Sequence, residues 1–159
     1  THRLKPLFRF LNRLKRNPPR NLQSIALKAG GNVWNEIDCL SCANCCKTMT
    51  PTYTNADIKK IATYLRISTD EMKSKWLKKE KATGNWVNRT TPCQFLDPET
   101  NMCNVYEARP ADCAGFPHLT KKRFVDYLHV HQQNLDECPA TFRMVAKMNE
   151  LVEKGIGNK

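Results

Sequence analysis

The sequence contains no run of about 20 apolar residues, so we predict no transmembrane segment. No stretch of it resembles a signal peptide, and no internal repeat or low-complexity segment stands out. No glycine-rich loop of the kind that cradles a nucleotide follows a predicted strand, and no arrangement of Ser, His and Asp suggests a nucleophilic triad. We therefore predict a cytoplasmic protein and assign no reaction from sequence, so whether it is an enzyme stays open.

Acidic residues are absent from the first part of the chain. The 159 residues carry a formal net charge of +11, and the first carboxylate is Glu36. Much of the positive charge precedes it, on Arg3, Lys5, Arg9, Arg13, Lys15, Arg16, Arg20 and Lys28. A basic surface of this kind favours an anionic partner or simple solvation.

The basic N-terminal stretch has the periodicity of an amphipathic helix. At 100° per residue one arc of about 120° holds the apolar side chains, which are Leu4, Leu7, Phe8, Leu11 and Leu14. The opposite side carries Arg9, Arg13 and Arg16, and Asn17-Pro18-Pro19 ends the helix. Such a helix can lie on an anionic membrane, grip nucleic acid or dock on protein. We expect its apolar face to pack on the body of the protein or on a protein partner, and we do not favour nucleic acid.

Three more helices carry start signals. Thr54 with Asp57 forms a capping-box pattern, Ser68 precedes Glu71 by three residues, and Pro139 stands at a favoured first helical position. We expect the last helix to bury Met144, Val145, Met148, Leu151 and Val152. The lysines from Lys73 to Lys81 are expected to be solvated rather than to read DNA. Residues 20–38 show no strong pattern, and Gly30-Gly31 is expected to form a bend before the first cysteine motif. Residues 122–131 could form a strand or a helix.

Residues 86–106 suggest short strands around a turn that contains Pro98 and Asn101. Such a hairpin would bring Cys93 and Cys103 together. The predicted fold is therefore α+β, a small, mainly helical single domain with a short β-hairpin, cysteine-rich and stapled by metal. We divide it into a basic amphipathic helix and linker at 1–35 and a cysteine-cluster metal-binding domain at 36–159.

Eight cysteines are the strongest chemical signal. They are Cys39, Cys42, Cys45, Cys46, Cys93, Cys103, Cys113 and Cys138. Four of them lie within eight residues, which is too close for several independent disulfides but suits convergence on one ion or cluster. We therefore expect all eight thiols to be metal ligands rather than disulfides.

Their spacing suggests a division into two sets of four. The two-residue spacing of Cys39, Cys42 and Cys45 is typical of three corners of a cubane iron–sulfur cluster, and Cys138, followed by Pro139, offers the fourth. The remainder, Cys46, Cys93, Cys103 and Cys113, could hold zinc or a second cluster. Two zinc sites of four thiolates divide the residues equally well, and any cysteine could change groups.

The histidines carry less weight as ligands. His118 follows Cys113 by five residues and could replace a thiolate, while His129 and His131 share a side only in a strand. A lone histidine is more often an ordinary surface or core residue than a metal ligand.

Several spaced motifs carry a family resemblance. They are Cys39-x2-Cys42-x2-Cys45-Cys46, Pro92-Cys93-x-Phe95-Leu96, Cys103-x-Val105-Tyr106-Glu107-x-Arg109-Pro110-x2-Cys113 and Phe116-Pro117. Over roughly residues 36–140 the chain resembles the YkgJ-type CxxCxxCC proteins, a zinc- or iron-chelating domain family. This resemblance implies metal-binding roles for the matched cysteines. The same module occurs in flagellin lysine N-methylases, where it is associated with an iron–sulfur cluster.

We expect, first, a metal-binding protein that holds an iron–sulfur cluster, with [4Fe-4S] favoured, or zinc, or both. An alternative is a metal-dependent enzyme or enzyme subunit in protein modification, such as lysine N-methylation, which needs an open coordination position or a cofactor pocket. A second alternative is a nucleic-acid-binding module with structural zinc, whose basic N-terminal helix would contact phosphates. Glu107 and Arg109 are expected to hold the loop that carries Cys113.

Overall fold

The computed structural model describes residues 2–119 and 123–155. Its contacts divide the chain into two compact units, a helical unit of Thr1–Asp38 with Pro117–Lys159 and a cysteine unit of Cys39–Phe116. The helical unit is thus built from both ends of the chain. Most elements are helices, and one small antiparallel sheet of three strands accompanies them, which confirms the predicted fold class. The predicted domain division at residue 35 stays a prediction.

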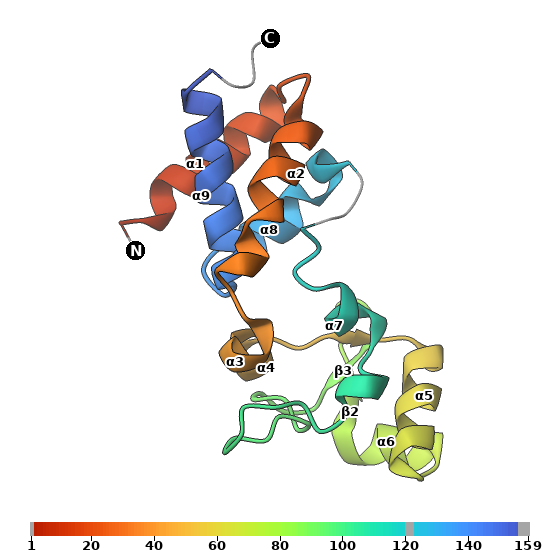
Figure 1. Ribbon diagram of the computed structural model, residues 1–159. Helices are drawn as coiled ribbons and strands as arrows, with labels where there is room; N and C mark the ends of the chain where they lie inside the picture. Colours follow the sequence, from red (N-terminus) through yellow and green to blue (C-terminus); the bar gives the residue numbers. More distant parts are fainter. Residues whose placement is uncertain (1, 120–122, 156–159) are drawn as a thin grey trace. The chain divides into compact units, whose positions relative to one another are not determined.

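The helical unit consists of α-helices, with a short 3₁₀ helix after α2 and another directly before α8. Helix α9 contacts both α1 and α2, and α1 also contacts α8, as Figure 1 shows. None of the helices among the described residues combines the length and apolar character that crossing a bilayer requires. The elements are α1 (Leu4–Arg16), α2 (Leu22–Gly31), η1 (Val33–Asn35), η3 (Phe124–Tyr127), α8 (Leu128–Asn134) and α9 (Pro139–Glu153).

Helix α1 ends at Arg16, before the two prolines, as predicted. Its apolar face packs on α8 and α9, which confirms that the body of the protein covers it. The composition of that face differs from the prediction, because Phe10 is 1% exposed while Leu4 and Phe8 are only half-buried. The buried set is Leu7, Phe10, Leu11 and Leu14. The buried side chains span an arc of about 100°, so contact with α8 and α9 shifts the buried face towards Phe10 and does not widen it.

Helix α2 was not predicted, because Gly30 and Gly31 suggested a bend. Both glycines are instead helical, and α2 makes extensive contact with α9. A Cβ atom added to Gly30 would stand 3.5 Å from Sδ of Met144 on α9. Gly30 therefore marks a close helix–helix contact. Helix α9 begins at Pro139 as predicted, and Gly155 follows its end with a positive φ of 72°.

The ambiguous segment 122–131 is helical where the structure describes it, in η3 and α8; residue 122 lies outside the described residues. Its histidines differ in environment. His129 is exposed, whereas His131 is completely buried, with its ring stacked on Phe124 at a centroid distance of 4.5 Å. His131 is therefore a core residue.

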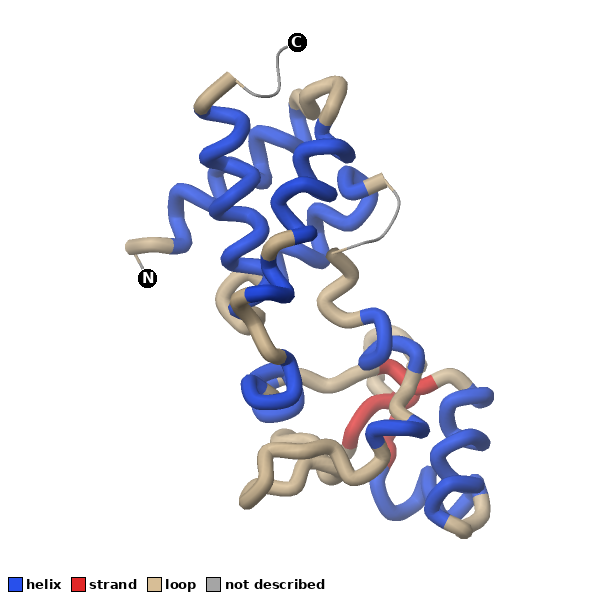
Figure 2. The backbone as a smooth tube through the Cα atoms, viewed as in Figure 1, coloured by secondary structure: helices blue, strands red, loops and turns tan. Residues whose placement is uncertain are grey.

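The cysteine unit combines short helices with the sheet, whose strand order is β1-β3-β2 (Figure 2). Trp86 pairs with Tyr53 on one side and with Lys79 on the other. Under the sheet lies an apolar core that includes Ile58, Ile61, Met72 and Leu77. The elements are α3 (Cys39–Cys42), α4 (Asn44–Thr48), β1 (Thr52–Tyr53), α5 (Asn55–Leu65), α6 (Thr69–Trp76), β2 (Leu77–Lys79), β3 (Trp86–Asn88), η2 (Tyr106–Ala108) and α7 (Ala111–Gly115).

Two capping predictions are confirmed in this unit. Thr54 and Asp57 form a reciprocal capping box at the start of α5, and the Ser68 hydroxyl accepts a hydrogen bond from the Glu71 N–H at the start of α6. The predicted hairpin is much smaller than expected. Only one bridge, Leu96 to Cys103, joins its arms, and Trp86 pairs instead with strands from outside the segment.

Candidate metal centre

The first four cysteines lie on two very short helices. Helix α3 carries Cys39 and Cys42, and α4 carries Cys45 and Cys46. Ala43 connects them in the left-handed conformation, with φ of 46°, and this turn changes the direction of the chain between the two pairs. Two short helices with a sharp turn thus present several thiols within a few residues of one another.

Cys93 and Cys103 are brought to the same place by the loop that follows β3. The Cys93 N–H donates a hydrogen bond of 2.7 Å to the carbonyl oxygen of Cys46, so the loop is tied directly to α4. At its far end, Nδ2 of Asn101 donates to the carbonyl oxygen of Ser41 at 2.6 Å. The single bridge between Leu96 and Cys103 closes the loop. The predicted approach of Cys93 and Cys103 is therefore realised by a loop anchored on both short helices.

Cys113 is carried by α7, which β1 and α5 hold in position. The Ala111 N–H donates to Oδ1 of Asp57 at 3.0 Å, and the Thr52 N–H donates to Oδ2 of Asp112 at 3.0 Å. Nζ of Lys60 donates to the carbonyl oxygen of Arg109 at 2.7 Å. Three polar contacts thus fix the backbone on both sides of Cys113.

The carboxylate of Asp57 serves two segments at once. Its Oδ2 accepts from the N–H and the hydroxyl of Thr54, at 3.0 and 2.6 Å, while Oδ1 accepts from Ala111. Burial raises the pKa of this carboxyl, but these hydrogen bonds outweigh it and leave the pKa below its ordinary value. The capping pattern predicted the first role. The second depends on tertiary structure and has no signal in the sequence.

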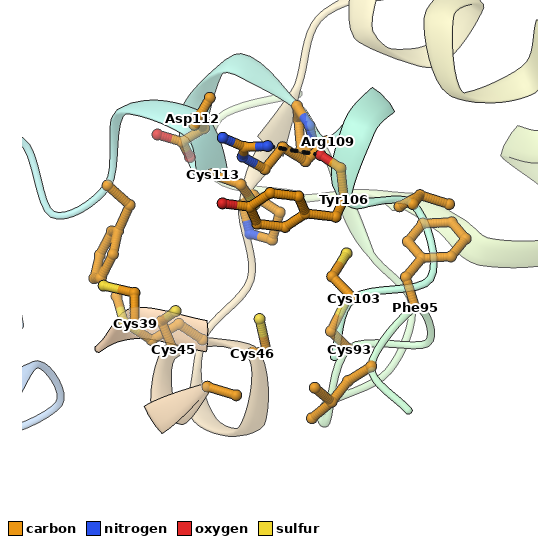
Figure 3. A pocket seen from close by; sticks show the side chains of 18 of the residues that line it. Cys39, Cys45, Cys46, Cys93, Phe95, Cys103, Tyr106, Arg109, Asp112 and Cys113 are labelled. Atoms are coloured by element: carbon orange, nitrogen blue, oxygen red, sulfur yellow. Dashed lines mark hydrogen bonds between the residues drawn. The ribbon is translucent and has the colours of Figure 1, made fainter. Parts of the chain in front are cut away.

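Six of the eight cysteines line one cavity of about 250 Å³ within the cysteine unit. They are Cys39, Cys45, Cys46, Cys93, Cys103 and Cys113, and they surround the cavity in Figure 3. Apolar side chains make up much of the remaining lining, among them Leu40, Phe95, Val105 and Phe116. All eight cysteines are free thiols in the structure. Cavity shape and thiol content together suit a soft metal or a cluster.

Two predicted ligands do not line this cavity. Cys42, on α3, is half-buried but is not part of the lining. Cys138 belongs to the helical unit, where it is 7% exposed and precedes α9. Among the described residues no three Cys, His, Asp or Glu side chains lie close enough together to hold one ion. The six thiols therefore surround a space rather than converge on a point.

Several of the thiols change one another's pKa values. A hydrogen bond from the Cys46 side chain lowers the pKa of Cys45 to about 7, and the same bond raises the pKa of Cys46. Burial, followed by the negative charges of Cys93 and Cys45, raises the pKa of Cys113 to about 12. Thiolates so placed repel one another in a partly desolvated space, and a bound cation would relieve that repulsion.

Tyr106 and Arg109 lie on the opposite side of the cavity from α3 and α4 in Figure 3. The Arg109 guanidinium stacks on the Tyr106 ring at 3.9 Å from the centroid, and its Nη1 donates to the Tyr106 carbonyl oxygen at 2.8 Å. This agrees with the predicted role of Arg109 in holding the loop before Cys113. Burial raises the pKa of Cys103, and the positive charge of Arg109 opposes that rise. Arg109 thus also brings positive charge towards the thiols.

A known protein family matches the part of the chain that contains these cysteines. The model of the CxxCxxCC family, described as "Putative zinc- or iron-chelating domain", matches residues 38–138 and so spans all eight cysteines. The chain belongs to the CxxCxxCC family. It therefore has the cysteine cluster to which that description assigns zinc or iron chelation. No reaction and no choice between the two metals follow from membership.

A relative of this CxxCxxCC protein is found in Methanocaldococcus jannaschii. It is named "Uncharacterized protein MJ0661" and is 34% identical over 86 residues, which cover 54% of this chain and 46% of the relative. The matched region thus spans about half the length of that protein. No solved structure matches the chain.

Proposed function

We propose that this CxxCxxCC protein binds a metal centre through its cysteine thiolates, with an iron–sulfur cluster of the [4Fe-4S] type favoured over zinc. The observation that carries this proposal is the single cavity lined by six thiols. A tetrahedral zinc ion and a [4Fe-4S] cluster each take four thiolates, so six around one space are enough for either centre. The two-residue spacing of Cys39, Cys42 and Cys45 is what favours the cluster. The free state of the thiols supports a reducing, cytoplasmic setting.

The chemistry of the donors fits such a centre. Thiolates are the usual ligands of iron–sulfur clusters and of structural zinc. Apolar side chains, among them Leu40, Phe95 and Val105, line the space between the thiols, and apolar surroundings influence the potential of a cluster.

Two groupings of the ligands are open to test. Spacing favours Cys39, Cys42, Cys45 and Cys138 for the cluster. A second grouping of Cys45, Cys46, Cys93 and Cys113 is supported by their mutual influence. A hydrogen bond with Cys45, then burial, then the charges of Cys45, Cys93 and Cys113 raise the pKa of Cys46. The second grouping lies entirely within the cysteine unit.

Metal analysis of anaerobically purified protein tests the proposal. We expect iron and acid-labile sulfide, together with thiolate-to-iron charge-transfer absorption. Two zinc ions per chain without sulfide would exclude the cluster. Matched variants then assign ligands. Cys93→Ser should reduce metal content in either grouping. Cys138→Ser should reduce iron only if the grouping from spacing is correct.

A further inference from the structure

The basic side of α1 forms one exposed line of cations. At 100° per residue, Lys5, Arg9, Arg13 and Arg16 fall within an arc of about 80°, and all four side chains are exposed. We call these four residues the basic stripe. No acidic residue precedes Glu36, and among the described residues none of the four forms a salt bridge with a carboxylate. The stripe therefore keeps its charge available for a partner.

The rest of α1 is fixed by the helical unit. Leu7, Phe10, Leu11 and Leu14 are buried, and the helix contacts α8 and α9. Nη2 of Arg13 also donates to Oδ1 of Asn149 on α9. A helix that binds in a membrane interface buries its apolar face in lipid. In α1 that face is already occupied, so only the charged side remains for binding.

The geometry of the stripe suits a linear polyanion. Its cations are three or four residues apart, which spaces them by about 5 to 6 Å along the axis and extends the stripe over about 17 Å. Phosphates repeat regularly along a nucleic-acid strand, and arginine binds them through a planar fork of donors. The amide beside the stripe is occupied, since Oδ1 of Asn12 accepts from Nε2 of Gln132 at 2.8 Å. The stripe thus offers charge to the phosphates, and the Asn12 amide is not free for a bidentate contact with adenine.

We propose that the basic stripe of α1 binds the phosphate backbone of a nucleic acid independently of its sequence. This goes beyond the metal centre and does not depend on it, because the stripe lies in the helical unit. Contacts to phosphates fix position but carry no sequence information. The stripe should behave as a general phosphate-binding surface with strong salt dependence.

Fluorescence anisotropy of the full-length protein with labelled 20-mers tests this proposal. Four phosphate contacts give a slope of log K against log salt of about −3.6 for duplex DNA and about −2.8 for a single strand. The double variant Lys5→Gln/Arg9→Gln should reduce the duplex slope to about −1.8. Neither side chain faces the core of the unit, and circular dichroism should show an unchanged fold.

A matched control removes the same charge from the cysteine unit. Lys78 and Lys81 are exposed, and Lys78→Gln/Lys81→Gln should leave the slope near that of the unaltered protein. An equal loss in both variants would overturn the proposal, because general basicity would then explain binding. Tighter binding to phosphatidylserine vesicles than to DNA, or equal competition by polyglutamate, would also overturn it. Equal affinity for 20-mers of different sequence, together with a reduced salt slope only in the stripe variant, supports the proposal.

Discussion

Replacing His131 tests how a buried imidazole limits stability in acid. The residue is 0% exposed, and neither ring nitrogen has a hydrogen-bond partner among the described residues. Burial, followed by the charges of His118 and His129, lowers the pKa of His131 from 6.5 to about 4. The unfolded chain therefore takes up a proton near pH 6.5, whereas the native protein resists it until about pH 4.

The sign of the effect follows from this difference. Between pH 6.5 and about 4 the unfolded state binds the additional proton, so acid favours unfolding. Each pH unit in this interval removes about 1.4 kcal/mol of stability, and the whole interval removes about 3 kcal/mol. The stabilising contribution of the neutral imidazole is thus complete above pH 6.5 and lost near pH 4.

His131→Leu removes the titrating group and keeps an apolar side chain against Phe124. Urea unfolding followed by circular dichroism from pH 7 to pH 4 gives the free energy of unfolding of both proteins. The variant should gain about 3 kcal/mol relative to the unaltered protein across this range. His129→Gln, at an exposed position, is the control. It removes only the smaller influence of the His129 charge on the pKa of His131, so most of the pH dependence should remain. Parallel pH dependences for the unaltered protein and His131→Leu would refute the reasoning.

Other substitutions address the contacts described above. Asp57→Asn leaves one acceptor oxygen where the hydrogen bonds to Thr54 and Ala111 need two. It should lower the free energy of unfolding by about 1 to 3 kcal/mol and make the protein lose metal to a chelator more readily. Thr54→Ala spares the hydrogen bond to Ala111, so it should lower stability without changing metal retention. Equal loss of metal in both would contradict a role of Asp57 in placing α7. Gly30→Ala should stabilise the helix by about 0.5 to 1 kcal/mol and so raise the melting temperature, because the added Cβ would make only ordinary contact with Met144. A lower melting temperature would show that this contact is strained. Removal of metal should lower the melting temperature of the cysteine unit and leave the helical unit folded, as hydrogen exchange can show.

Local signals predicted the helix starts well. Thr54, Ser68 and Pro139 each act within one turn of the chain, so their effect is visible in a few residues. Gly30 shows the limit of such signals. The residue that suggests a bend is in fact helical because α9 lies against it. A glycine packed against a neighbouring helix and a glycine required by a turn look the same in sequence.

The cysteine spacing identifies candidate metal ligands, but it does not show which of them lie together in the fold. All eight residues were candidates from their number and spacing, yet the cavity combines Cys39, Cys45 and Cys46 with Cys93, Cys103 and Cys113 from distant segments. Their approach depends on the hydrogen bond between Cys93 and Cys46 and on the support of α7 by Asp57. Contacts between residues far apart in the chain leave no periodic pattern, which explains why spacing alone left the groupings open.

Because the helical unit is built from two distant parts of the chain, those parts are synthesised far apart in time. The cysteine unit is continuous, so all its residues are available before α8 and α9 are made. Helix α1 must meanwhile wait for α9, whose last residue lies 137 positions beyond Arg16. At 5–20 residues per second this wait is roughly 7 to 27 s, during which Leu7, Phe10, Leu11 and Leu14 lack their partners. The nascent chain therefore exposes the apolar face of this positively charged helix until α8 and α9 follow.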